Sequence, residues 1–98
     1  MPVYFVAQYV VNDAAKYGQY AKAAGPVIAA NGGKVIAFDV AAKTVEGKAP
    51  GPQTVILEFE NEAALNGWYR SDEYQAVIQG RLEATEGFAV VAQSMNAG

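Results

Sequence analysis

Residues 59–81 read Phe-Glu-Asn-Glu-Ala-Ala-Leu-Asn-Gly-Trp-Tyr-Arg-Ser-Asp-Glu-Tyr-Gln-Ala-Val-Ile-Gln-Gly-Arg, and this stretch decides how the rest of the chain is interpreted. Asn61 is a residue type that caps the first turn of a helix, and Ser71 repeats the signal further along. Acidic residues follow both caps, which suits the positive end of a helix dipole. The stretch therefore predicts two short helices, broken at Arg70–Ser71, that follow the end of a strand.

Apolar side chains recur at helical spacing in both halves of this stretch. They are Ala64, Leu65 and Trp68 in the first half and Tyr74, Val77, Ile78 and Leu82 in the second. Trp68, Tyr69 and Tyr74 have two interpretations, since large aromatic side chains either fill a core or line a ligand cleft. The residues themselves leave both interpretations open.

The composition indicates one small domain over residues 1–98. Hydrophobic residues make up 52% and charged residues 17% of the chain, so apolar surface is either packed in a dense core or hidden in an oligomer. The net charge of −3 argues against a nucleic-acid partner, because the five lysines and two arginines form no basic stripe to meet phosphates.

The missing residue types exclude several kinds of chemistry. The chain has no cysteine, which excludes disulfides and thiolate catalysis, and no histidine, which removes the commonest general base and most zinc or iron sites. We therefore expect no metal and no cofactor. No apolar run approaches the roughly 20 residues of a membrane span, and no signal pattern opens the chain, so we expect no membrane partner and a cytoplasmic location.

Four segments have the β-branched and aromatic composition of strands. They are Val3–Val11, Lys34–Val40, Gln53–Glu60 and Gly87–Met95. The first and last are apolar on both of their alternating faces. A sheet with one solvated face would alternate more cleanly, so these strands are expected to be covered on both sides.

A longer helix is predicted after the first strand, capped by Asn12 or Asp13. Its apolar stripe comprises Tyr17, Tyr20, Ala21, Ala24 and Ile28. Gly25–Pro26 should kink or restart the helix, because Pro26 has no N–H to donate to the carbonyl of Lys22. Asn31–Gly33 should end it through a left-handed cap.

The remaining segments are connections. Ala41–Glu46 could extend the second strand as a small ribbon, and Gly47–Pro52 has the composition of an exposed loop. Residues 96–98 are expected to be a frayed chain end.

The predicted order of elements is β-α-β-β-α-β, which is the α+β arrangement called ferredoxin-like: a four-stranded antiparallel sheet with the helices on one face. The helices account for one apolar face of the sheet. A second copy of the chain is expected to cover the other, forming a sheet-to-sheet dimeric α/β barrel.

The motif residues resemble one known family. Phe59, Glu62–Ala63, Trp68–Tyr69, Ser71, Glu73–Gln75 and Arg81 are joined upstream by Asp13, Tyr17, Tyr20, Pro26, Gly32–Gly33 and Glu46–Gly47. In this pattern the chain resembles the domain-of-unknown-function 1330 family of the dimeric α/β-barrel superfamily, over nearly its whole length. The resemblance implies the fold and the homodimer and little about function.

Three positions depart from the family pattern. Asp39 stands in the second strand where relatives often carry a basic residue, Gln8 stands where they tend to be acidic, and Gln93–Met95 lacks a Glu-Gly ending. An acidic side chain at residue 39 would invert the charge preference of a pocket there, so any anion binding at that place would be lost or altered.

Related barrels include cofactor-independent monooxygenases, isomerases and decarboxylases, which makes an enzyme a legitimate hypothesis by fold analogy. Glu58 or Asp39 could act as a base, Tyr69 or Tyr74 could donate to an oxyanion, and Arg81 could hold a substrate carboxylate. The plainer interpretations make Glu58 a polar residue of the dimer interface and Arg81 a helix-face partner of Glu73.

Two functional hypotheses follow. In the first, a homodimer binds a small apolar or aromatic molecule in a cleft beside Trp68 and Tyr74, with Glu58, Tyr74 and Arg81 as candidate catalytic residues for proton-transfer or oxygenase chemistry. Trp68, Tyr69, Asp39 and Tyr17 are the candidate ligand-binding residues. In the second, the protein is a structural or regulatory dimer without a small ligand. If the space beside Trp68 is filled by its neighbours, the first hypothesis fails.

Overall fold

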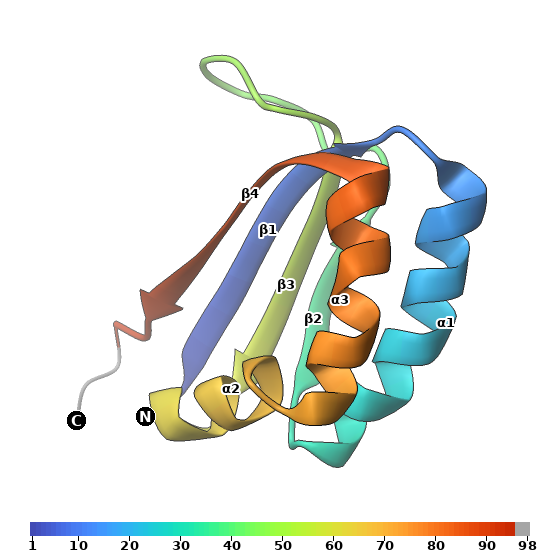
Figure 1. Cartoon of the computed structure of the whole chain (residues 1–98). Coiled ribbons are helices and arrows are strands. Elements are labelled where there is room, and N and C mark those ends of the chain that lie inside the picture. Colours follow the sequence, from blue (N-terminus) through green and yellow to red (C-terminus); the bar gives the residue numbers. More distant parts are fainter. Residues whose placement is uncertain (96–98) are drawn as a thin grey trace.

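The computed structural model describes residues 1–95, so the expected frayed end at 96–98 lies outside the described residues. The elements are β1 (Val3–Val11), α1 (Ala14–Ala30), β2 (Lys34–Asp39), β3 (Gln53–Phe59), α2 (Glu62–Tyr69), α3 (Asp72–Ala84) and β4 (Thr85–Gln93). This order confirms the predicted ferredoxin-like arrangement, with its second helical segment divided into α2 and α3 (Figure 1).

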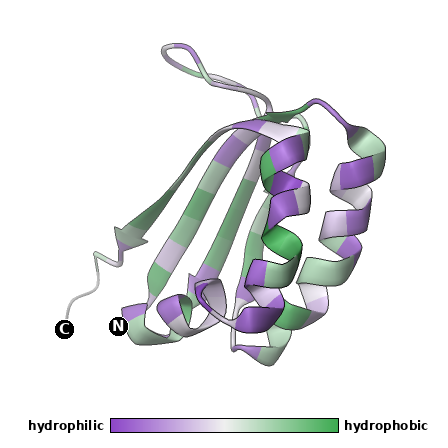
Figure 2. Ribbon diagram, viewed as in Figure 1, coloured by the Kyte–Doolittle hydropathy of each residue, from purple (hydrophilic) through white to green (hydrophobic). Residues whose placement is uncertain are grey.

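The four strands form one antiparallel sheet in the order β2-β3-β1-β4. In β1 the side chains of Val3, Phe5, Ala7 and Tyr9 are buried under the helices, and the alternating residues are only half-buried. The helices lie on one side of the sheet (Figure 1). No helix or strand among residues 1–95 covers the opposite side, which we call the open face, and only the 41–52 loop borders it, near Gln8 and Phe88. Figure 2 shows how apolar the strands are.

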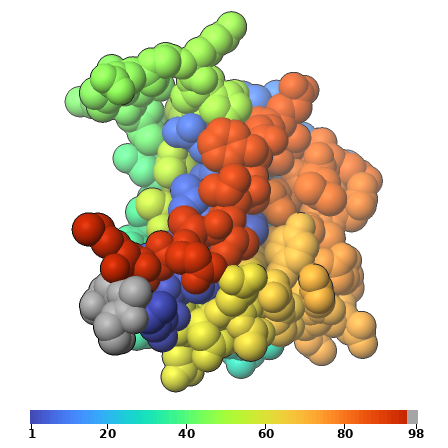
Figure 3. Space-filling model, turned by 90° about the vertical axis from the view of Figure 1, so that its left-hand side faces the viewer, coloured from blue at the N-terminus to red at the C-terminus, as the bar shows by residue number. Residues whose placement is uncertain are grey.

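The segment after β2 corrects one prediction. Ala41–Glu46 forms no strand, and the Ala42 N–H donates to the Pro52 carbonyl at 3.0 Å at the base of a loop. The 41–52 loop projects from the molecule and leans to the side of the sheet away from α3 (Figure 3). Proline and glycine in its second half suit a loop and not a paired ribbon.

Helix α1 also differs from expectation, because it runs unbroken through Pro26 and does not restart. Pro26 and Lys22 are both exposed, so water can reach the carbonyl that loses its helical donor. The Asp13 side chain caps the helix by accepting from the Lys16 N–H at 3.0 Å. The helix ends at Asn31, and Gly32 follows with φ of 84°, as the predicted left-handed termination requires.

The two caps of the 59–81 stretch are confirmed. The Asn61 side chain accepts from the Ala64 N–H at 2.8 Å at the start of α2. The Ser71 hydroxyl accepts from the Tyr74 N–H at 3.1 Å and donates to the Trp68 carbonyl at 2.8 Å. Ser71 thus closes α2 and opens α3 with one side chain, which explains why the two helices break there.

The core between helices and sheet is dominated by aromatic rings. Trp68 is completely buried, and its ring lies 5.2 Å from Phe5, 5.1 Å from Phe59 and 4.4 Å from Tyr74, measured between centroids. Offset and edge-on contacts of this kind contribute beyond their buried area. The space beside Trp68 is therefore filled by its neighbours.

The buried stripe of α3 differs from the predicted one at its C-terminal end. Leu82 was expected to face the core but is 51% exposed, whereas Tyr74, Ile78, Arg81 and Ala84 are buried. Residues 74, 78 and 81 share one face of a helix as well as 74, 78 and 82 do, and here the rotation of α3 selects Arg81.

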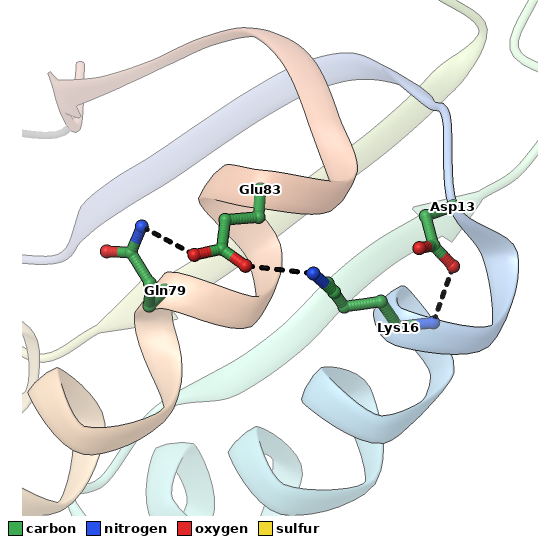
Figure 4. A network of polar contacts seen from close by, with 4 residues as sticks. All are labelled: Asp13, Lys16, Gln79 and Glu83. Atoms are coloured by element: carbon green, nitrogen blue, oxygen red, sulfur yellow. Dashed lines mark hydrogen bonds and ion pairs between the residues drawn. The ribbon is translucent and has the colours of Figure 1, made fainter.

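A surface network joins α1 to α3 (Figure 4). The Lys16 Nζ lies 2.9 Å from a carboxylate oxygen of Glu83, whose other oxygen accepts from Gln79 at 3.1 Å. The hydrogen bond from Lys16 is the main cause that lowers the pKa of Glu83. No helix among residues 1–95 is long and apolar enough to cross a membrane.

Candidate functional site

Arg81 is the most unusual residue of the core, because its side chain is charged and only 6% exposed. It projects from α3 toward the sheet, and its guanidinium lies 5.9 Å from the ring of Phe5 and 6.0 Å from the ring of Tyr20. Both contacts are within the range of cation–π attraction. The ring faces therefore offset part of the cost of burying the charge.

No carboxylate offsets the remaining cost of burying the Arg81 charge. The one ion pair among residues 1–95 joins Lys16 to Glu83, and Arg81 Nε has no hydrogen-bond partner in the described chain. The expected pairing of Arg81 with Glu73 does not occur, since Glu73 lies on the exposed side of α3. Burial acts to lower the pKa of Arg81, but the charge interactions with Tyr74 and Tyr20 raise it by more. The pKa therefore lies above its usual value, and the guanidinium stays charged.

Tyrosine hydroxyls surround this charge in two pairs. The hydroxyls of Tyr9 and Tyr17 are 2.8 Å apart, and those of Tyr20 and Tyr74 are 2.6 Å apart. Burial is the largest cause that raises the pKa of Tyr9, Tyr17 and Tyr20. These phenols therefore remain protonated near neutral pH and act as hydrogen-bond donors or acceptors, not as bases.

Three buried N–H atoms of the core have no hydrogen-bond partner in the described residues: Arg81 Nε, Gln53 Nε2 and Trp68 Nε1. The Arg81 and Gln53 side chains do interact with the hydroxyls of Tyr74 and Tyr17. Because buried polar groups are nearly always satisfied, an unpaired N–H beside a cavity is a place where an added acceptor would be favourable.

A cavity of about 250 Å³ opens onto Arg81 between α3 and β4. We call it the Arg81 cavity, and it is lined by Tyr9, Tyr69, Arg81, Leu82, Thr85, Gly87, Phe88 and Ala89. No residue with a side chain fits at position 87 without a shift of the backbone, because a Cβ on Gly87 would lie 2.1 Å from the Gln8 carbonyl oxygen and 2.6 Å from Tyr9 Cα. That close approach brings β4 and the end of α3 around Tyr9.

Five of the sequence-predicted residues come together on the helix side of the sheet. Tyr69 and Arg81 line the Arg81 cavity, and Tyr17 lies behind it, bonded to the Tyr9 hydroxyl. Trp68 and Tyr74 are fully buried beside it and do not line it. The prediction of a cleft beside Trp68 and Tyr74 is therefore wrong, because their neighbours fill that space, and the Arg81 cavity is a different site.

Glu58 and Asp39 lie elsewhere. Glu58 is paired in register with Tyr4 and Lys34 and points to the open face, so the sheet separates it from Arg81 and Tyr74. Asp39 is exposed at the end of the edge strand β2, where its carboxylate accepts from the Ala41 N–H at 2.8 Å. A molecule held by Arg81 would reach neither carboxylate.

Several residues around Arg81 were not singled out from the sequence. Tyr9, Gln53 and Thr85 come from three different strands, and Tyr9 is the register partner of both Gln53 and Gly87. The alternation of β1 could have placed Tyr9 on the core face. The register that brings Gln53 beside it depends on pairing between distant segments.

The described residues contain no group of three or more His, Cys, Asp or Glu side chains that could hold a metal ion. The side chains that line the Arg81 cavity supply one cation, hydroxyls and apolar surface. This arrangement can bind and orient an anionic group, and it offers that group no carboxylate neighbour.

Solved structures share this fold. A protein of unknown function from Rhodopseudomonas palustris matches with a TM-score of 0.81 at 19% identity, over 97% of this chain and 83% of that one. A protein from Bacteroides fragilis, described as dimeric, of unknown function and ferredoxin-like, matches at 0.63 and 14%, over 95% and 96%. An ethyl tert-butyl ether D family protein from Bacillus halodurans matches at 0.62 and 14%, over 97% and 100%.

The sequence itself places the chain in a family. No curated protein matches it significantly. The profile of one domain family, described as a domain of unknown function, covers residues 2–95, which is nearly all of the chain. The resemblance carried by the 59–81 stretch is thereby confirmed, and the chain belongs to the DUF1330 family.

Proposed function

We propose that this protein is a homodimeric domain that binds a small molecule through a negatively charged group held by Arg81. One observation carries the proposal: a buried guanidinium without a carboxylate partner in the described chain stands at the wall of a 250 Å³ cavity. The Tyr9 hydroxyl and the Tyr69 ring line the same space.

The energetics favour a role in binding over a role in packing. Burying an ion costs several kcal/mol even after relaxation, and the two ring contacts offset about 1–2 kcal/mol each at most. An apolar side chain of similar length would fill the same volume without that cost. Arginine is instead the residue type that pairs with a carboxylate in a planar, two-pronged geometry.

Catalysis is a narrower form of the same proposal. Arg81 and the protonated Tyr9 hydroxyl could stabilise negative charge that develops on a bound molecule, as a cofactor-independent proton-transfer or oxygenase reaction requires. No carboxylate lines the Arg81 cavity, so a base for such a reaction would have to come from the ligand or from water. We therefore propose binding as the function of this site.

In this proposal, the two copies of the homodimer contact each other through the open face. Most of its residues are apolar, and Gln8 and Thr54 form a polar pair among them. The apolar residues are Tyr4, Val6, Val10, Ile56, Phe88 and Val90. Phe88 and Val90 are about half exposed in the single chain. The Bacteroides fragilis neighbour with this fold is described as dimeric, which supports a dimer here.

The test uses the two arginines of the chain as a matched pair. Calorimetric titration with benzoate should show binding by the native protein and by Arg70→Met, whose arginine is exposed. Arg81→Met should weaken binding about 10- to 100-fold, because it removes hydrogen bonds to a charged group. Urea unfolding should show Arg81→Met to be as stable as the native protein, or about 1 kcal/mol more stable.

Two results would contradict the proposal. One is benzoate binding that is unchanged in Arg81→Met. The other is a loss of more than about 3 kcal/mol of unfolding free energy in Arg81→Met, which would make the arginine structural. No binding of any small carboxylate would favour the second candidate, a dimer without a small ligand, which the filled space around Trp68 already supports.

A further inference from the structure

A second cavity continues the first along β4. It has a volume of about 170 Å³ and is lined by Phe5, Leu65, Asn66, Tyr69, Ala89, Val90 and Val91. We call it the Phe5 cavity. Tyr69 and Ala89 line both cavities, so the two cavities lie next to each other. We call the two adjacent cavities, between the helices α2 and α3 and the edge strand β4, the groove.

The groove exists because the helices do not reach across β4. Val91 is the register partner of Phe5 and points to the helix side of the sheet, yet it is 46% exposed. In Figure 1, β4 lies at the edge of the sheet and α1 at the far side. The helix-side surface of β4 thus has no cover among the described elements.

The two ends of the groove differ in chemistry. The Arg81 end holds a cation and the Tyr9 hydroxyl, whereas the Phe5 end is formed by an aromatic ring and aliphatic side chains with one amide, Asn66. No acidic residue lines either cavity. Each cavity alone is smaller than the usual small-molecule site of about 300–1,000 Å³, so a ligand of ordinary size would have to occupy both.

We propose that the ligand is an amphipathic carboxylate, with its acid group on Arg81 and its apolar body extending past Tyr69 into the Phe5 cavity. This inference rests on the proposed function and adds the class of ligand. Charge complementarity favours an anionic ligand, because the groove holds the Arg81 cation and no acidic residue lines it. A second copy or a peptide strand added to the edge of β4 would bury the apolar end but leave the buried guanidinium without an anion.

The test is a series of carboxylates with a phenyl group on a lengthening chain: benzoate, phenylacetate, 3-phenylpropionate and 4-phenylbutyrate. Calorimetric dissociation constants should improve about two- to fourfold per added methylene, as each enters apolar surroundings. The single tryptophan gives a second readout, because Trp68 lies 5.2 Å from Phe5 and 5.6 Å from Tyr69. Its fluorescence should change more with the longer acids.

A variant confined to the Phe5 cavity separates the two ends of the groove. Val91 lines the Phe5 cavity and not the Arg81 cavity. Val91→Phe should fill the Phe5 cavity, leaving benzoate affinity within about twofold while 4-phenylbutyrate loses its gain of about 8- to 60-fold. Ala76→Phe is the control, since Ala76 is exposed on α3 and lines neither cavity. It should leave the whole series unchanged.

The outcomes distinguish this inference from the proposed function. If short acids bind in an Arg81-dependent way but chain length has no effect, the amphipathic ligand is excluded and the anion site stands. If Val91→Phe affects benzoate and 4-phenylbutyrate equally, the Phe5 cavity is not the tail site. If methyl esters bind as well as the acids, or if no acid binds, both proposals fail.

Discussion

Arg81 and the tyrosines around it form a polar interior that a protein of this size could have built from apolar residues. The two hydroxyl pairs are buried and short, and they belong to three elements, β1, α1 and α3. Such a network rigidifies the core when every member is satisfied and is costly where one is not. Of the buried N–H atoms without a partner in the described chain, Arg81 Nε belongs to a residue that lines the Arg81 cavity, where an incoming acceptor would be favourable.

The buried phenols predict a stability that depends on alkaline pH. Burial raises the pKa of Tyr9, Tyr17 and Tyr20 above the unfolded value of about 10, so the folded state holds protons that the unfolded state loses. Their contribution is complete below pH of about 10 and is lost as the pH rises above it. Ultraviolet titration of tyrosinate should show fewer than the six tyrosines ionising near pH 10 in the native protein, and all six in denaturant.

Tyr9→Phe serves as the control for that titration. It should lower the number of late-ionising tyrosines by one, or by more if the loss of its hydroxyl partner frees Tyr17. Simultaneous ionisation of all six tyrosines near pH 10 in a protein that stays folded would contradict the assignment.

Among the elements, the α2–α3 pair depends on one serine. Ser71 accepts from the first turn of α3 and donates to the last turn of α2, so the hydroxyl satisfies a backbone group of each helix. Ser71→Ala should lower the unfolding free energy by about 1 kcal/mol, as loss of a cap usually does. Urea unfolding measures the change.

Ser71→Thr is the matched variant, because it keeps the hydroxyl. It should stay within about 0.5 kcal/mol of the native protein. Equal losses in Ser71→Ala and Ser71→Thr would show that packing, and not capping, makes Ser71 important.

At the scale of the whole molecule, no helix or strand of the described chain covers the largely apolar open face. Val90 points to that face and Val35 points to the helix side, and the two are similarly exposed at 50% and 58%. In the proposed dimer, Val90→Glu should raise the dimer dissociation constant at least about tenfold, because each interface would bury unpaired carboxylates. Light scattering across a concentration series measures this, with Val35→Glu as the control that stays dimeric.

The dimer has a direct counter-test. A native protein that is a monomer at micromolar concentration would overturn it, and with it the explanation for strands that are apolar on both faces. Monomer formation by Val35→Glu alone would place the interface on the helix side of the sheet.

Local patterns predicted the elements well because the forces that set them act over a few residues. Asn61 and Ser71 capped the helices that they were expected to cap, and the period-two and helical patterns gave the correct order of strands and helices. The restart at Pro26 and the ribbon at Ala41–Glu46 were wrong, because solvent exposure at Pro26 and the lack of a pairing partner for the loop outweighed local preference.

The sequence by itself determined the ferredoxin-like order and the apolar faces of the strands, since both follow from residue periodicity. Only the tertiary structure decided the composition of the site. The rotation of α3 buried Arg81 in place of Leu82, and the register of β1 with β3 and β4 set Tyr9 beside Gln53 and Gly87. The same packing put Glu58 on the far side of the sheet. The physical reason is that alternation within a strand shows which residues share a face, but contacts between distant segments choose which face the helices cover.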